Sequence, residues 1–167
     1  MDKTRTHRYT VTNRWTGNLG TGTSSYRAYS RNHELTAPRK EALIAGSSDP
    51  AFRGDPARYN PEELLVSAVS ACHMLWALHL CADAGIVVIE YTDEAVGEVV
   101  EHPDGSGEFS RILLRPQMLI QDGARIPDAL AVHDRVPHFC CLARSVKATV
   151  EHQVRVAAVA PDSAELS

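Results

Sequence analysis

The chain has 167 residues, of which 44% are hydrophobic, so it is long enough to bury a genuine core. Its 17 basic and 21 acidic residues give a formal net charge of -4 with no basic block, which argues against nucleic acid or a membrane surface as a partner. The polar N-terminus lacks the apolar segment of a secretory signal, and four cysteines in such a chain indicate a reducing compartment. We therefore expect a cytoplasmic protein with a single domain over residues 1–160 and a frayed tail over residues 161–167.

The N-terminal third contains two strand-like runs, residues 7–15 and 25–35, joined by a glycine-rich segment. This arrangement predicts an antiparallel pair. Residues 36–59 then form a long connection that is rich in turn-forming and charged residues. Because connections of that length are usually functional or disordered, we look for site residues there.

A long helix is clearly marked at its start and its end. Asn60 is a good N-cap, Pro61 suits the first helical position, Glu63 completes a capping box and Gly85 is the natural stop. Residues 64–82 carry no formal charge, and the apolar positions cover most of the circumference, which is typical of a buried or membrane-spanning helix. Two histidines, two serines and acidic residues at both ends argue against a membrane span, so we expect a core helix.

The second half of the chain predicts a hairpin, a short helix and a last strand. Residues 86–102 and 107–121 flank the turn sequence PDGSG, residues 127–136 form a helix that Pro137 ends or kinks, and residues 146–156 alternate as a half-buried strand. The order predicts an α+β domain with antiparallel sheet wrapped around the central helix. Since one sheet covers only one side of that helix, we expect an obligate, intertwined homodimer in which two central helices pack together.

The four cysteines differ in their expected roles. Cys81 lies nine residues after Cys72, on the opposite side of the helix, and we expect it to be packed in the core. Cys140 and Cys141 are adjacent, and we expect one of them to point at a buried Cys72. Zinc bound by His133, His138 and these two cysteines is the alternative, but the chain has no C-x-x-C motif to support it.

A reactive Cys72 would need a cation nearby, because burial alone raises the pKa of a thiol. The connection before the helix offers Arg39, Arg53 and Arg58, and Glu62 or Glu63 could hold a guanidinium in place. Glu62 lies about 15 Å from Cys72 along one straight helix. The two could approach only across an antiparallel pair of helices from two chains.

The stretches NPEELLVSAVSACHM and CCLARSVKATV resemble the OsmC/Ohr family of osmotically inducible and organic-hydroperoxide-resistance proteins, and the resemblance runs from about Tyr9 to Val156. It is similar to an OsmC-like branch rather than to Ohr itself. The resemblance implies a homodimeric α+β fold and a cysteine peroxidase site at the dimer interface, with no metal, haem or other cofactor.

On matching positions the resemblance implies that Cys72 is the peroxidatic cysteine, Cys140 the resolving one, and Glu62 and Arg53 the activating carboxylate and arginine. The chain departs from the family pattern at Cys141, Arg144 and Pro137. Whether Cys140 or Cys141 resolves therefore stays open.

These residues together favour a thiol-dependent peroxidase that detoxifies organic hydroperoxides during oxidative stress. Leu75, Trp76 and Phe139 would line an apolar substrate pocket, since burial of an alkyl tail gains ~0.8 kcal/mol per methylene. A dithiol would recycle the disulfide, either a lipoyl protein, as in the Ohr branch, or another thiol. The alternative is a redox-sensing or hydrophobic-ligand-binding protein of the same fold with little turnover.

Overall fold

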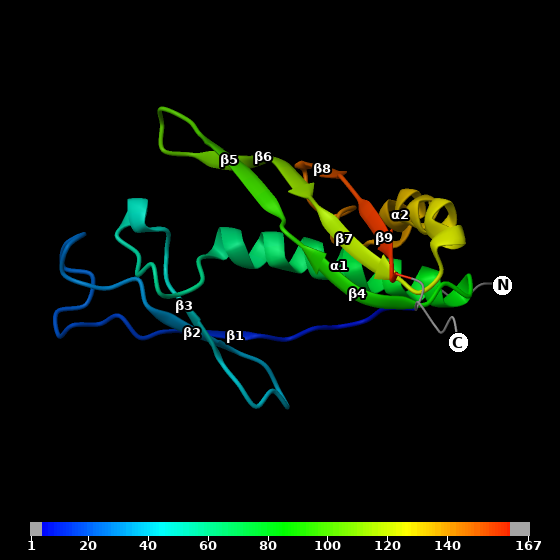
Figure 1. Cartoon of the computed structure of the whole chain (residues 1–167). Helices are drawn as coiled ribbons and strands as arrows, with labels where there is room; N and C mark the ends of the chain where they lie inside the picture. Colours follow the sequence, from blue (N-terminus) through cyan, green and yellow to red (C-terminus); the bar gives the residue numbers. More distant parts are fainter. Residues whose placement is uncertain (1–4, 161–167) are drawn as a thin grey trace. The chain divides into compact units, whose positions relative to one another are not determined.

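The structure is a computed structural model that describes residues 5–160, so the predicted tail at residues 161–167 lies outside the described residues. The chain forms two compact units, one ending at Leu64 and the other starting at Leu65 (Figure 1). Each unit is described by itself. The predicted single domain over residues 1–160 stays a prediction.

The first unit is a three-stranded antiparallel sheet. Its strands are β1 (Thr12–Trp15), β2 (His33–Thr36) and β3 (Ile44–Gly46), in the order β1-β2-β3. The predicted antiparallel pair is confirmed, with Trp15 opposite His33. The glycine-rich segment is a wide loop instead of a tight hairpin turn, and the Trp15 indole donates to the Ser30 carbonyl across it at 2.8 Å. The third strand lies in the predicted long connection, where only three residues pair.

Helix α1 (Pro61–Asp83) begins and ends as the sequence predicts. The Glu63 amide donates to Asn60 Oδ1 at 2.7 Å, and the Asn60 amide donates to Glu63 Oε2 at 3.0 Å, which is a complete capping box. Gly85 follows with a φ of 69°, a left-handed conformation that glycine adopts without steric cost. The capping box therefore fixes the start of α1, and Gly85 allows the chain to turn away at its end.

The second unit contains two mixed three-stranded sheets. They are β4-β7-β9 and β5-β6-β8, with strands β4 (Val88–Asp93), β5 (Val96–Glu101), β6 (Gly107–Leu114), β7 (Pro116–Ile120), β8 (Thr149–His152) and β9 (Arg155–Ala158). The predicted hairpin is confirmed around the PDGSG turn, where the His102 amide donates to the Ser106 carbonyl at 2.7 Å. Strands β8 and β9 pair in parallel with β6 and β7, so the sheets are not purely antiparallel.

Three strands expected to be continuous are each broken in two. The breaks fall between β4 and β5, at Arg115 between β6 and β7, and between β8 and β9. At the first two of these breaks, the Asp93 carboxylate accepts hydrogen bonds from the Ser70 hydroxyl at 2.5 Å and from the Arg115 amide at 2.6 Å. One long ribbon of three segments thereby becomes two sheets. The predicted last strand over residues 146–156 is wrong in this respect, although its alternation of exposed and half-buried residues is confirmed.

The second helix, α2 (Ile126–Phe139), follows the short 3-10 turn η2 (Gly123–Arg125) and includes Pro137. Of the two expected effects of Pro137, the end of the helix is wrong, because α2 continues to Phe139, and the kink stays a prediction. Proline lacks only the amide that would bond four residues back, and the chain resumes regular bonding when the Cys140 amide donates to the Val136 carbonyl at 2.9 Å. The helix thus carries the chain directly to the cysteine pair.

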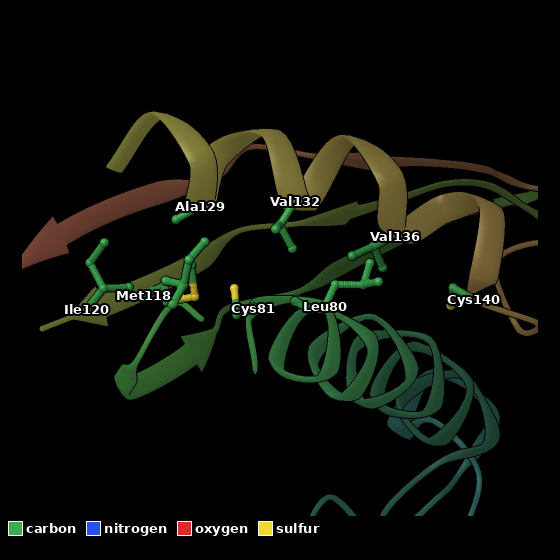
Figure 2. Close-up of a cluster of buried hydrophobic side chains, with 10 residues drawn as sticks. Leu80, Cys81, Met118, Ile120, Ala129, Val132, Val136 and Cys140 are labelled. Carbon is green, nitrogen blue, oxygen red and sulfur yellow. The ribbon is translucent and has the colours of Figure 1, made fainter. Parts of the chain in front are cut away.

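The main core of this unit lies between α1, α2 and strand β7. Figure 2 shows Ala129, Val132 and Val136 of α2 facing Leu80 and Cys81 of α1, with Met118 and Ile120 beside them. A smaller cluster packs around Val69, Ile112 and Leu114 at the other sheet. Each sheet therefore covers one part of the same helix.

Helix α1 is only partly covered within the unit. Among the described residues it is the one helix that by length and composition could span a membrane, with a mean hydropathy of 1.7 over its most apolar stretch. Only 28% of that stretch is buried in the structure, and Leu75 is 61% exposed. The buried residues Val69, His73, Ala77 and Leu80 follow one stripe of the helix. The remaining apolar surface is not covered by the described residues of the second unit.

Candidate active site

Cys72 lies near the middle of α1 and is half-buried, packed against the edge of the main core. Burial of this thiol between two chains, which the sequence predicts, stays a prediction. Its side chain projects beside the buried stripe of the helix, because residue 72 precedes the stripe residue His73 by one position, or about 100°. Cys81, in contrast, is fully buried in that core, as packing predicts.

The turn after α2 closes over Cys72. Cys72 packs against the core cluster that contains Cys140, and Cys140, Cys141 and the Leu142 backbone lie close enough to influence its pKa. Cys140 is 0% exposed and also receives the Ala143 amide on its sulfur at 3.5 Å, whereas Cys141 is exposed. All four cysteines are free thiols. The structure thus brings together the two cysteine segments, which lie almost 70 positions apart in the sequence.

The electrostatics of Cys72 differ from the sequence expectation. Burial, followed by the hydrogen bond and charge of Cys140, raises the pKa of the Cys72 thiol, and the Leu142 backbone and Cys141 counteract this only in part. No cation contributes to this pKa among the residues that the structure describes. A thiolate at Cys72 would therefore need a positive charge that these neighbours do not supply.

An apolar wall stands next to the thiols. Trp76 lies one helical turn after Cys72, and its ring stacks on Phe139 with centroids 5.0 Å apart. Both rings pack against the core cluster that includes Cys140. Two of the three predicted substrate-binding residues therefore meet, while Leu75 points to the exposed side of α1.

Arg53 lies in the first unit, in a tightly built loop. Asp49 caps the 3-10 turn η1 (Pro50–Phe52), Arg53 follows with a φ of 64°, and the Gly54 amide donates to the Asp49 carbonyl at 3.0 Å. A Cβ at Gly54 would clash with the Ser48 carbonyl, so this close turn requires glycine. The Arg53 guanidinium forms no ion pair or hydrogen bond within residues 5–160.

The two acidic residues at the start of α1 have different roles. Glu63 is occupied by the capping box, while Glu62 is exposed and its carboxylate has no hydrogen bond or ion pair in the described part of the chain. Glu62 and Cys72 are ten residues apart on one regular helix, about 15 Å along its axis. Within one chain the two side chains do not meet.

The alternative metal centre is not assembled. Residues 5–160 hold no group of three or more histidine, cysteine, aspartate or glutamate side chains placed to bind a metal ion. His133 turns instead to His73, and the His138 ring lies edge-on against Phe139. Sequence analysis did not find the His73–His133 pair or the Leu142 and Ala143 amides, because backbone donors carry no sequence signal and the histidines are 60 positions apart.

A family model and several solved structures match this chain. The family model for OsmC-like proteins matches residues 54–155, a span that contains both cysteine segments. The chain belongs to the OsmC family. No curated protein matches the sequence.

Solved structures of the family share the fold. The chain is similar to an OsmC-like protein of unknown function from Vibrio cholerae, with 26% identity and a TM-score of 0.79 over 90% of this chain and 100% of that one. It is also similar to an organic hydroperoxide resistance protein from Legionella pneumophila, with 12% identity and a TM-score of 0.64 over 92% and 99% of the two chains. The organic hydroperoxide resistance protein OhrB of Bacillus subtilis gives 16% identity and a TM-score of 0.58 over 90% and 98%. The last two identities indicate a shared fold alone, and the expected OsmC/Ohr fold is confirmed.

Proposed function

We propose that this OsmC-family protein is a thiol-dependent peroxidase that reduces organic hydroperoxides during oxidative stress. The observation that carries the proposal is the packing of Cys72 against the core cluster that contains Cys140. One partly accessible free thiol on α1 and one buried free thiol directly after α2 are what a peroxidatic and resolving pair requires.

The chemistry proceeds in two steps. The Cys72 thiolate attacks the outer oxygen of ROOH, so the O–O bond breaks, Cys72 becomes a sulfenic acid and ROH leaves. The Cys140 sulfur then attacks the Cys72 sulfur, which forms the disulfide and releases water. An external dithiol, such as a lipoyl protein, reduces the disulfide. Cys141, exposed beside Cys140, is the alternative resolving residue.

The activating charge is proposed to come from Arg53, held by Glu62. The structure supports this indirectly, since both charged groups lack partners among the described residues and Glu63 is already occupied. A guanidinium near Cys72 would lower the pKa that burial has raised. Arg53→Lys keeps the charge but loses the planar fork, so peroxidase activity should fall while protein folding is unchanged.

A homodimer accounts for the uncovered surface of α1. The helix exposes Leu75 and much of its apolar surface, and a second copy of the same helix is the partner of matching chemistry. Two antiparallel copies would bring Glu62 of one chain toward Cys72 of the other. The dimer, the cytoplasmic location and the absence of a cofactor remain part of this proposal.

The apolar wall supports a preference for organic substrates. The stacked rings of Trp76 and Phe139 offer an alkyl or aryl tail a surface beside the thiols, which hydrogen peroxide cannot use. Leu75 belongs to this wall only if the dimer partner folds over it. Cumene hydroperoxide should therefore be consumed faster than hydrogen peroxide.

Steady-state consumption of cumene and tert-butyl hydroperoxide with dithiothreitol tests the proposal. The wild type should turn over many times, and Cys72→Ser should be inactive. The raised pKa of Cys72 favours one competing function, a redox sensor with slow chemistry. A sensor would oxidise once per chain and then stop, so a stoichiometric burst without turnover would replace the peroxidase proposal.

A further inference from the structure

A buried histidine pair joins α1 to α2 next to the thiols. His73 is 3% exposed and His133 is 0% exposed, and His73 Nε2 lies 2.9 Å from His133 Nδ1. The two rings stack with centroids 5.2 Å apart. One ring nitrogen donates and the other accepts, as neutral imidazoles can. The proposed peroxidase chemistry uses neither ring.

The pair connects the two elements that carry the reacting sulfurs. His73 follows Cys72 directly on α1, and His133 lies two helical turns before Cys140 on α2. Elsewhere these helices meet through apolar side chains such as Leu80 and Val136. Apolar contact is non-directional and tolerates small rotations, whereas a hydrogen bond fixes distance and angle.

Among the described residues, His133 forms no other side-chain hydrogen bond. Its Nε2 atom is buried and has no partner among the residues that the structure describes, so His73 is the single polar contact of this ring. Burying an imidazole for one hydrogen bond is costly compared with an apolar side chain of similar size. A role in fixing geometry explains why a polar residue stands at this position.

The charges around the pair keep the bond intact at neutral pH. The pKa of each histidine is lowered to about 4, mainly by burial; His133 adds to this lowering at His73, and His152 of β8 adds to it at both rings. Asp93 of β4 and Asp134 of α2 act in the opposite direction, and the Tyr91 ring of β4 stacks at 6.2 Å from His133. With both rings neutral, one proton is available for the shared N–H···N bond.

We propose that His73 and His133 are positioning residues whose hydrogen bond holds Cys140 at the distance and rotation from which it attacks oxidised Cys72. The inference rests on the proposed peroxidase function and deepens it. A disulfide requires a narrow range of Cα distances and a dihedral angle near 90°, so a small rotation of α2 would misplace the Cys140 sulfur. The first oxidation step, the attack of Cys72 on the peroxide, does not involve Cys140. The pair should therefore affect disulfide formation and leave sulfenic acid formation unchanged.

The test separates the two steps after one equivalent of cumene hydroperoxide. Dimedone traps the sulfenic acid, and mass spectrometry of quenched samples follows the disulfide. In the variant His73→Leu/His133→Leu, both ends of the bond are removed without leaving an unpaired group. Sulfenic acid should form at the wild-type rate, while disulfide formation slows at least about tenfold, because misplacement of reacting atoms by an ångström is that costly. His102→Gln, on the exposed hairpin turn, is the control and should match the wild type.

A second comparison does not require the double variant to fold. Asparagine places its amide near the position of a histidine Nδ1 atom, so His133→Asn retains an atom that can bond to His73, while His133→Ala does not. Disulfide formation should stay close to wild type in the first and slow in the second. Equal rates in the two variants would overturn the inference. If the wild type itself formed no disulfide between Cys72 and either C-terminal cysteine, the peroxidase proposal would fail first.

Discussion

Acidification should destabilise the protein through the buried histidine pair. The pKa of His73 and of His133 is about 4 in the folded chain and 6.5 as the ordinary value. Below pH 6.5 these two histidines therefore bind protons in the unfolded chain but stay neutral in the folded chain. The free energy of unfolding falls as the pH drops from 6.5 toward 4. Above pH 6.5 this contribution is fully present.

The size of the effect follows from the same two values. At pH 5 one such histidine has lost about 2 kcal/mol of its contribution to stability, since each pKa unit corresponds to about 1.4 kcal/mol. The two sites repel each other when both are charged, so the pair contributes between one and two times this amount. Such a loss is a large fraction of the stability of an ordinary domain.

Urea unfolding at pH 7 and pH 5, followed by circular dichroism at one protein concentration with reduced thiols, measures this difference. The variant His73→Leu/His133→Leu is the matched control, because the carboxylates that also respond to acid are the same in both proteins. The wild type should lose about 2 to 4 kcal/mol more than the variant over this interval. If both proteins lost stability equally, the histidines would not be buried and uncharged as the structure has them.

Three further predictions concern the thiols, the helix surface and the sheet. Cys72→Ser should leave Cys140 reduced after one equivalent of hydroperoxide, whereas Cys140→Ser should accumulate a trappable sulfenic acid, both read by peptide mapping; a Cys72-independent disulfide would contradict the mechanism. Leu75→Glu should convert a dimer to monomer in sedimentation velocity, because it places a charge on the exposed apolar side of α1, and an unchanged mass would remove this surface from the interface. Gly97→Ala should lower the free energy of unfolding by about 1–3 kcal/mol, since its Cβ would lie 2.5 Å from Val66 and 2.6 Å from Phe109. Gly123→Ala, whose nearest contact is 3.4 Å, should cost less, and equal costs would show that the sheet relaxes freely.

The elements that were predicted well are those whose signals are local. The capping residues Asn60 and Glu63 and the stop at Gly85 are encoded within a few positions, so both ends of α1 could be placed from the sequence. The PDGSG turn is equally local. Sequence reasoning led us to expect that Cys140 or Cys141 points at Cys72, but it left both alternatives open, because nothing within either segment specifies the contact.

The features that sequence analysis missed depend on distant contacts. The break at Arg115 is set where Asp93 accepts the Arg115 amide and the Ser70 hydroxyl of α1. The His73–His133 bond pairs residues on two helices. Pro137 was overestimated as a helix breaker, because near the end of a helix it removes one hydrogen bond while tertiary packing of α2 on the core holds the remaining turns.

The shared breaks in the three long segments have a consequence for folding. Each segment supplies one strand to β5-β6-β8 and one to β4-β7-β9, so a slip of one residue in either sheet would displace the covalently attached strand of the other. The two sheets must therefore find their alignment together. They should form a single cooperative element whose amide protons become protected from exchange at the same stage of refolding.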